Sequence, residues 1–284
     1  MPFRMKSVRC ASQAGFHEMV YRDWGRSDAA KTVVCVHGLT RNGRDFERLA
    51  DALASDGHRV LCPDIVGRGA SDRLGPGGAY EVPQYVADLT TMLAAEGLRS
   101  VDWIGTSMGG LIGMAMAAMP GGPIRRMVLN DVGPFIPKAA LQRIGDYVGV
   151  EWRFDTFQKA EAHIRAAYAP FGLESDEDWR FMTEISTARD EAGCWVNAYD
   201  PRIADPFRGD QIADADLWYL WDAIRIPIFV MRGAESDLLT PEIAKEMTRR
   251  GPGAEVLEIP GCGHAPALMD SHQIGVLRDW CRSA

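Results

Sequence analysis

Ser107 lies in the stretch Gly105-Thr106-Ser107-Met108-Gly109-Gly110, which follows an apolar run at 101–104 and precedes small apolar residues. This pattern predicts that a buried strand turns sharply into a helix at the serine. The two outer glycines would remove Cβ atoms that collide in such a turn, and the serine itself would be strained. Its hydroxyl would project over a helix N-terminus, whose amides favour a developing anion. The stretch therefore predicts a nucleophilic serine.

A serine nucleophile needs a general base, an acid that orients the base, and donors for the oxyanion. His264 is the candidate base, because it lies in Gly261-Cys262-Gly263-His264-Ala265-Pro266, directly after a predicted strand at 255–259. The flanking glycines would let this loop bend towards Ser107. His264 would then take the serine proton and later return it to a leaving group.

Three carboxylates are candidates for the acid. Asp237 follows a predicted strand at 226–231, which would end at the same edge of the sheet as the serine and the histidine. Asp237 is therefore the predicted acid. Asp131 also ends a strand and is the alternative, although it could instead cap the turn before Gly133-Pro134. Glu235 lies two residues before Asp237 and is the third candidate.

The oxyanion donors are predicted to be backbone amides. One is the amide after the nucleophile, that of Met108. The other is predicted to be the Leu39 amide of the loop His37-Gly38-Leu39-Thr40. His37 is interpreted as a structural hydrogen-bonding residue. It has no second histidine or carboxylate at ligand spacing, so no metal site is expected.

The stretch 64–71 superficially resembles a phosphate-binding loop. It has Gly67 and Gly69 but Asp72 in place of the third glycine of G-x-G-x-x-G, and it lacks G-K-[ST]. The stretch is therefore interpreted as a structural turn beside the active site, and no cofactor is expected.

The elements that must position these residues alternate between strands and helices. Strands are predicted at 32–37, 58–62, 101–105, 126–131, 226–231 and 255–259, after an N-terminal hairpin at 7–11 and 17–23. Helices are predicted between them, at 46–54, 82–95, 111–119, from 240 and at 272–281. This order predicts an α/β fold with a mostly parallel central sheet and helices on both faces.

The alternation is interrupted after residue 134. Roughly ninety residues separate two buried strands, too many for a plain loop, and helices are predicted at 138–147, 156–168 and 176–187. We expect a core formed by 1–134 and 223–284 and a helical cap inserted at 135–222. Aromatic residues are frequent in this insertion; some of them would line an apolar pocket, while most would hold the helical lid together. They include Trp152, Phe154, Phe157, Tyr168, Phe171, Trp179, Trp195, Trp218 and Trp221.

Composition is that of a globular protein, with 46% apolar and 25% charged residues among 284. The net charge of −8 disfavours nucleic acid and anionic membranes as partners. The basic N-terminus is not followed by an apolar segment, so a cytoplasmic location is expected. Six scattered cysteines without a C-x-x-C pair are expected to be free thiols. The number of subunits is left open.

Together these motifs resemble the α/β-hydrolase superfamily in its capped form. The resemblance covers nearly the whole chain and rests on His37-Gly38, Asp64-x-x-Gly67-x-Gly69-x-Ser71, Gly105-x-Ser107-x-Gly109, Asp237 and Gly263-His264, in that order. The order Ser, Asp, His along the chain is that of this superfamily. The chain looks most similar to bacterial carboxylesterases, lactonases and the C–C bond hydrolases of aromatic catabolism.

The resemblance implies a cofactor-independent serine hydrolase that cleaves a small, largely apolar carboxylic ester or lactone through an acyl-enzyme on Ser107. The first alternative is a C–C bond hydrolase that uses the same triad. Thr106 counts against it, because such enzymes commonly have asparagine at this position. The second alternative is a ligand receptor that keeps the fold but turns its ligand over slowly.

Overall fold

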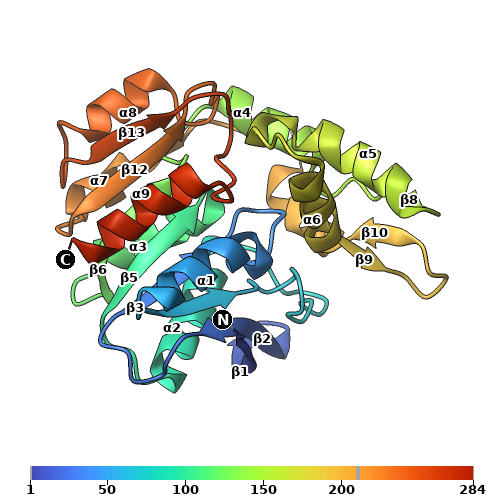
Figure 1. Cartoon of the computed structure of the whole chain (residues 1–284), viewed down its shortest axis with the longest axis horizontal. Helices are drawn as coiled ribbons and strands as arrows, with labels where there is room; N and C mark the ends of the chain where they lie inside the picture. The colour runs from blue at the N-terminus through green and yellow to red at the C-terminus, as the bar shows by residue number, and fades with distance from the viewer. Residues whose placement is uncertain (1, 209–211, 284) are drawn as a thin grey trace.

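The structure is a computed structural model that describes residues 2–208 and 212–283; the predicted domain ranges also include 1, 209–211 and 284, which lie outside the described residues. The centre of the molecule is an eight-stranded sheet (Figure 1). Its strands are β1 (Arg4–Ser12), β2 (Gly15–Trp24), β3 (Thr32–Val36), β4 (Arg59–Pro63), β5 (Val101–Thr106), β6 (Ile124–Asn130), β12 (Ile228–Gly233) and β13 (Glu255–Ile259). Their spatial order is β1-β2-β4-β3-β5-β6-β12-β13.

The sheet is mostly parallel, which confirms the predicted fold class. Strand β2 pairs antiparallel with β1 and with β4, and the pairs from β4 to β13 are parallel. Every residue of β3, β4 and β12 is buried. Strands covered on both faces by helices read as continuous apolar runs, and this is why the sequence predicted them.

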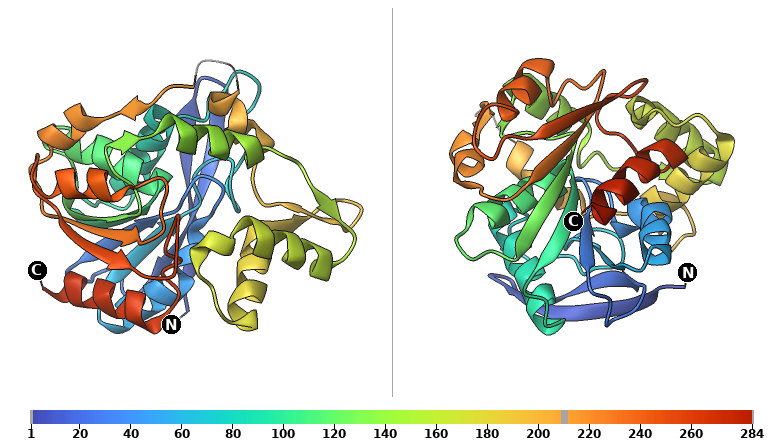
Figure 2. Two further views of the ribbon diagram at one scale, coloured as in Figure 1. Left: turned by 90° about the horizontal axis from the view of Figure 1, so that it is seen from above. Right: turned by 60° about the vertical axis from the view of Figure 1, so that its left-hand side comes forward.

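Helices cover both faces of the sheet (Figures 1 and 2). Helices α1 (Glu47–Ser55) and α9 (Ser271–Arg282) share one apolar cluster. Helices α2 (Val82–Ala95), α3 (Met108–Ala118), α7 (Trp218–Ala223) and α8 (Pro241–Met247) share the other. Successive residues of β3 alternate between the clusters, with Val34 in the second and Cys35 in the first, because side chains of a strand alternate in direction.

Apart from α7, which packs on the core, the segment between β6 and β12 lies beside one end of the sheet in Figure 1. It contains α4 (Lys138–Tyr147), α5 (Phe157–Ala167), α6 (Asp176–Ser186), and short 3-10 helices at Ala169–Phe171 and Pro201–Phe207. It also contains short strands, which form a three-stranded sheet and a two-stranded sheet. These strands are β7 (Phe135–Ile136), β8 (Arg153–Phe154), β9 (Thr187–Arg189), β10 (Trp195–Asn197) and β11 (Ala215–Asp216).

The tryptophan residues of this segment belong to different apolar clusters. Trp179 is buried in a local cluster with Ile164 and Met182, and Trp152 packs against that cluster. Trp221, by contrast, is fully buried in the core cluster beside α3 and α8. Trp221 and Trp179 thus contribute to packing and do not line the cavities at Ser107. The boundaries of the inserted domain stay a prediction.

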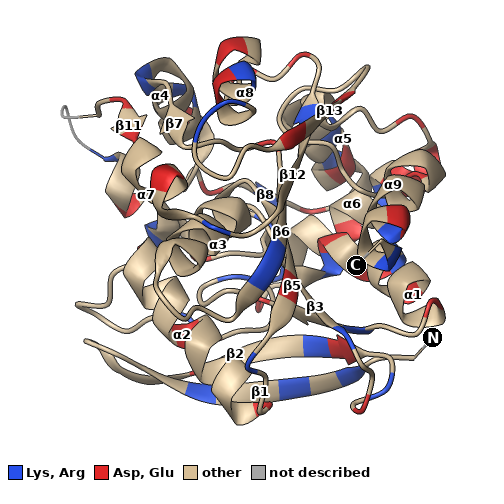
Figure 3. Ribbon diagram, turned by 90° about the vertical axis from the view of Figure 1, so that its left-hand side faces the viewer, with Lys and Arg blue, Asp and Glu red and all other residues tan. Residues whose placement is uncertain are grey.

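The two edge strands carry charged side chains, which discourage pairing with other sheets. Strand β1 carries Arg4, Lys6 and Arg9, and Figure 3 shows basic residues along its length. Strand β13 carries Glu255 and Glu258. Among the described residues, no helix has the length and apolar character needed to cross a membrane.

Candidate active site

Ser107 lies at a sharp turn between β5 and α3. Its backbone has φ 50° and ψ −113°, which an L-residue rarely adopts. The turn requires glycine at 105 and 109, because backbone segments approach very closely there. A Cβ on Gly105 would lie 2.5 Å from the Gly109 carbonyl carbon, and a Cβ on Gly109 would lie 2.0 Å from the Val36 oxygen. The neighbouring strand β6 stabilises this strained conformation, since the Ser107 amide donates to the Asn130 carbonyl at 3.0 Å.

His264 joins Ser107 to Asp131. The serine hydroxyl lies 2.9 Å from His264 Nε2, and His264 Nδ1 lies 2.7 Å from Asp131 Oδ2. With a carboxylate at Nδ1, that nitrogen carries the proton, and Nε2 is left to accept the serine proton. The Asp131 side chain is 0% exposed and that of His264 only 13% exposed. This is the arrangement of a nucleophile, a base and an orienting acid.

The Asp131 carboxylate accepts hydrogen bonds from three donors. The Asp131 backbone is strained, with a φ of 56°. Besides His264, the Gly233 amide donates to Oδ1 at 2.9 Å and the Ser236 hydroxyl donates to Oδ2 at 2.6 Å. Several donors stabilise the charged form of a carboxylate and fix its orientation. Ser236 was not singled out in the sequence, because its only signal was its position after a buried strand.

The prediction that Asp237 orients His264 is wrong. The Asp237 carboxylate is 53% exposed and forms a two-bonded ion pair with Arg143 of α4, at 2.6 and 2.8 Å. Strands β6 and β12 are neighbours in register, with Met231 opposite Asn130, so both end at the same edge of the sheet. Beyond Gly233 the chain turns, and Asp237 is carried outward. The third candidate, Glu235, is exposed as well, and its amide donates to the Cys262 carbonyl.

Leu39 and Met108, the predicted oxyanion residues, both line a cavity together with Ser107. The preceding residue, Gly38, approaches closely, since a Cβ there would lie 3.7 Å from the Ser107 Cβ. Arg68 positions this loop by donating from Nε to the Leu39 carbonyl at 2.9 Å. The sequence did not indicate this role, although Arg68 lies within the stretch 64–71.

His37 links the same loop to the next one. Its Nδ1 donates to the Gly38 carbonyl at 2.7 Å, and its Nε2 accepts from the Ile65 amide at 2.9 Å. Complete burial lowers the pKa of His37 to about 3, so the ring stays neutral and keeps both bonds. This histidine supports the loop.

The stretch 64–71 forms a turn built on the Asp64 carboxylate. Asp64 accepts from the Gly43 amide at 2.7 Å, from the Ala70 amide at 2.8 Å and from Arg22 at 3.0 Å. A Cβ on Gly69 would lie 2.4 Å from Asp64 Oδ2. The glycine is therefore needed for close packing against the carboxylate.

Two cavities adjoin Ser107, and Leu39 and Ile144 also line both of them. One, of about 250 Å³, is lined almost wholly by apolar groups of α3, α4 and the 3-10 helix Pro201–Phe207, among them Leu111, Ile144 and Ile203. The other, of about 130 Å³, is lined by His264 and by polar side chains that include Arg143. A third, of about 100 Å³, adjoins the second through Tyr147 and Tyr168. Of the aromatic residues of the inserted segment, Tyr147, Tyr168 and Phe171 line the cavity that contains His264, and Phe207 lines the apolar one.

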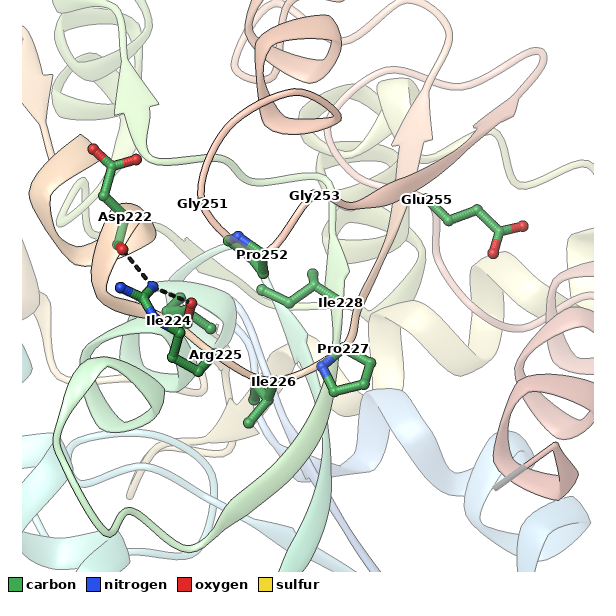
Figure 4. A pocket seen from close by; sticks show the side chains of 10 residues that line it. All are labelled: Asp222, Ile224, Arg225, Ile226, Pro227, Ile228, Gly251, Pro252, Gly253 and Glu255. Atoms are coloured by element: carbon green, nitrogen blue, oxygen red, sulfur yellow. Dashed lines mark hydrogen bonds between the residues drawn. The ribbon is translucent and has the colours of Figure 1, made fainter.

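A larger cavity, of about 860 Å³, lies elsewhere. Figure 4 shows it between the loop around Arg225 and the loop Gly251 to Glu255, and none of its lining residues borders the cavities at Ser107. Arg225 there donates to the carbonyls of Asp222 and Ile224. No chemically reactive group such as a buried nucleophile lines it among the described residues.

Within the described part of the chain, one cluster has the composition of a metal site. The ligand atoms of Cys10, His17 and Asp88 lie within 4.8 Å of one another and are buried. Burial, together with Asp88, raises the pKa of the Cys10 thiol to about 12, so this thiol is protonated at neutral pH. His17 and Asp88 are already bonded at 2.9 Å. The cluster is better described as a buried hydrogen-bonded pair beside a thiol.

The chain belongs to the α/β-hydrolase family, whose fold model matches residues 31–270. It is 44% identical over 281 residues to a 3-hydroxybutyrate-oligomer hydrolase of Cupriavidus necator, covering 96% of each chain. It is 25% identical over 229 residues to a 2-(acetamidomethylene)succinate hydrolase of Mesorhizobium japonicum, covering 80% of this chain and 79% of the relative. A solved α/β hydrolase from Novosphingobium aromaticivorans superposes with a TM-score of 0.88, at 35% identity and 99% coverage of both chains.

These similarities confirm the predicted superfamily and establish the chain as a hydrolase.

Proposed function

We propose that the chain is a serine esterase that hydrolyses esters of short hydroxy acids, of the kind found in 3-hydroxybutyrate oligomers. The observation that carries the proposal is the continuous chain of hydrogen bonds from Ser107 through His264 to Asp131, beside an apolar cavity. The 44% identical relative, named for 3-hydroxybutyrate oligomers, supports the substrate class.

In the first half of the reaction, Ser107 Oγ attacks the ester carbonyl carbon and His264 Nε2 accepts the hydroxyl proton. The amides of Leu39 and Met108 donate to the oxyanion that forms. The intermediate then breaks its bond to the alcohol oxygen, and His264 gives that oxygen its proton. Asp131 accepts a hydrogen bond from the Nδ1–H group of His264 throughout and stabilises the imidazolium, which keeps its Nδ1 proton.

In the second half, His264 removes a proton from a water molecule, which attacks the acyl carbon. The bond to Ser107 Oγ breaks, the serine recovers its proton from His264, and the carboxylic acid leaves. The apolar cavity provides room for the acyl part, which is consistent with small, largely apolar acids or lactones.

The test is the hydrolysis of p-nitrophenyl butyrate and of the 3-hydroxybutyrate dimer by Ser107→Ala. We expect kcat to fall by roughly 10⁶-fold, because the nucleophile is removed. Ser55→Ala, which changes an exposed serine of α1, serves as the control and should be unaffected. Unchanged hydrolysis by Ser107→Ala would refute the proposal. If the unaltered protein rapidly turns over a vinylogous diketone acid and hardly hydrolyses the two esters, it is a C–C bond hydrolase instead. If it turns over neither the diketone acid nor the two esters, it is a receptor.

A further inference from the structure

The two cavities beside Ser107 differ in charge. The apolar cavity does not include His264 and has a single ionisable acid, Glu81, among its described lining residues. The second cavity includes His264 together with Arg41 and Arg143, and its described lining residues include no carboxylate. A cavity with guanidinium groups and no lining acid is suited to an anionic group.

Only one of the two arginines is available to a ligand. The Arg41 side chain is 4% exposed, and Asp45 binds it at 2.7 and 3.1 Å. It also donates to Ser186 and stacks on the Tyr168 ring. Arg143 is 43% exposed; Asp237 binds it through Nε and Nη2, and the Tyr147 hydroxyl interacts with it as well. The Nη1 hydrogens of Arg143 are therefore not used by Asp237.

The reaction chemistry decides which part of the substrate enters this cavity. His264 must protonate the oxygen of the leaving alcohol, so the alcohol part lies on the His264 side of Ser107. In an oligomer of a hydroxy acid, the alcohol part released at the free-acid end carries a carboxylate. That carboxylate would thus enter the cavity lined by Arg143, while the acyl part occupies the apolar cavity.

We propose that Arg143 binds the carboxylate of the leaving hydroxy acid, so that the enzyme selects esters whose alcohol part carries a free acid. This inference rests on the proposed function for the direction in which the ester lies. A planar guanidinium that offers parallel donors is the group best matched to a carboxylate. Asp237 holds the guanidinium from its other edge.

The experiment measures binding without turnover. In a Ser107→Ala background, calorimetry gives the Kd of the 3-hydroxybutyrate dimer as the free acid and as its methyl ester. Adding Arg143→Gln should weaken binding of the free acid by about tenfold or more and change binding of the methyl ester by less than about twofold. Arg143→Lys, which keeps the charge, should restore part of the lost affinity.

The matched control is Arg250→Gln. Arg250 forms a similar half-exposed pair with Asp222, and it does not border either cavity at Ser107. It should leave both Kd values unchanged. Equal weakening of the free acid and the methyl ester, no weakening of either, or no binding of either would overturn the inference.

Failure of the proposed function has a different signature. Hydrolysis of p-nitrophenyl butyrate with Ser107 intact tests the esterase without a carboxylate in the substrate. If that hydrolysis is absent while the acid-specific effect of Arg143→Gln persists, the esterase proposal falls and the carboxylate site stands. If hydrolysis is present and the acid-specific effect is absent, only the inference about Arg143 falls.

Discussion

At the scale of single residues, burial distinguishes two aspartates that follow neighbouring strands. Asp131 is enclosed and receives hydrogen bonds from His264, Gly233 and Ser236. Asp237 lies half in solvent, where an ion pair contributes little to stability. A carboxylate can fix the tautomer of a histidine only from within hydrogen-bond distance, and Asp131 alone of the two meets this condition.

We expect Asp131→Asn to lower kcat for p-nitrophenyl butyrate by roughly 10⁴-fold, because an amide at Nδ1 favours the wrong histidine tautomer. Asp237→Asn should leave kcat for this uncharged ester near that of the unaltered enzyme. Steady-state kinetics on both variants shows which of the two aspartates orients His264. A loss in Asp237→Asn as large as that in Asp131→Asn would show that the assignment of the acid is incorrect.

At the scale of elements, the turn between β5 and α3 depends on how closely α3 approaches β3. Gly109, in the first turn of α3, lies against the carbonyl of Val36. Because the two backbones touch, the contact cannot be relieved by rotating a side chain. The predicted helix began at 111, whereas the observed one begins at Met108, since glycines at the start of the helix concealed its true beginning.

Gly109→Ala should destabilise the protein by at least about 2 kcal/mol or prevent folding, because the added methyl group overlaps backbone. The matched control is Gly275→Ala in α9, where a Cβ would meet nothing within 4 Å. That change should instead stabilise by roughly 0.4–1 kcal/mol, as alanine is the better helix former. Urea unfolding of both variants measures the difference, and equal midpoints would contradict it.

At the scale of the whole molecule, a buried neutral histidine links folding to pH. His37 connects the loop of Leu39 to the loop of Ile65, and its pKa falls from 6.5 to about 3 because it is buried. Its contribution to stability is complete above pH 6.5. Below that pH, the unfolded chain takes up a proton that the folded chain does not, so stability declines until about pH 3.

The free energy of unfolding should therefore fall as pH decreases through this window, and His37→Gln should make the decline less steep. Urea unfolding at several pH values provides the measurement. His272→Gln, which changes an exposed histidine of α9, is the control and should keep the slope of the unaltered protein. The same slope in His37→Gln would mean that His37 is not the source of the proton uptake.

The sequence by itself determined the parallel strands, the helices that alternate with them, and the positions of Ser107 and His264. These features are local: apolar runs predict buried strands, and a serine between glycines after such a run predicts a sharp turn. It also indicated the inserted helices, because so long an interval between strands cannot be a loop. The sequence did not predict the strands β7 to β11, because strands of two or three residues are too short to show a periodic pattern.

The tertiary structure alone decided which aspartate contacts His264, which of the two arginines at the polar cavity is exposed, and which tryptophan belongs to the core. Asp131 and Asp237 each follow a buried strand, and the two strands lie side by side, so their sequence contexts are equivalent. Only the path of the chain after Gly233 carries Asp237 into solvent beside Arg143. Contacts between segments distant in sequence depend on packing in three dimensions, and no local pattern of residues records them.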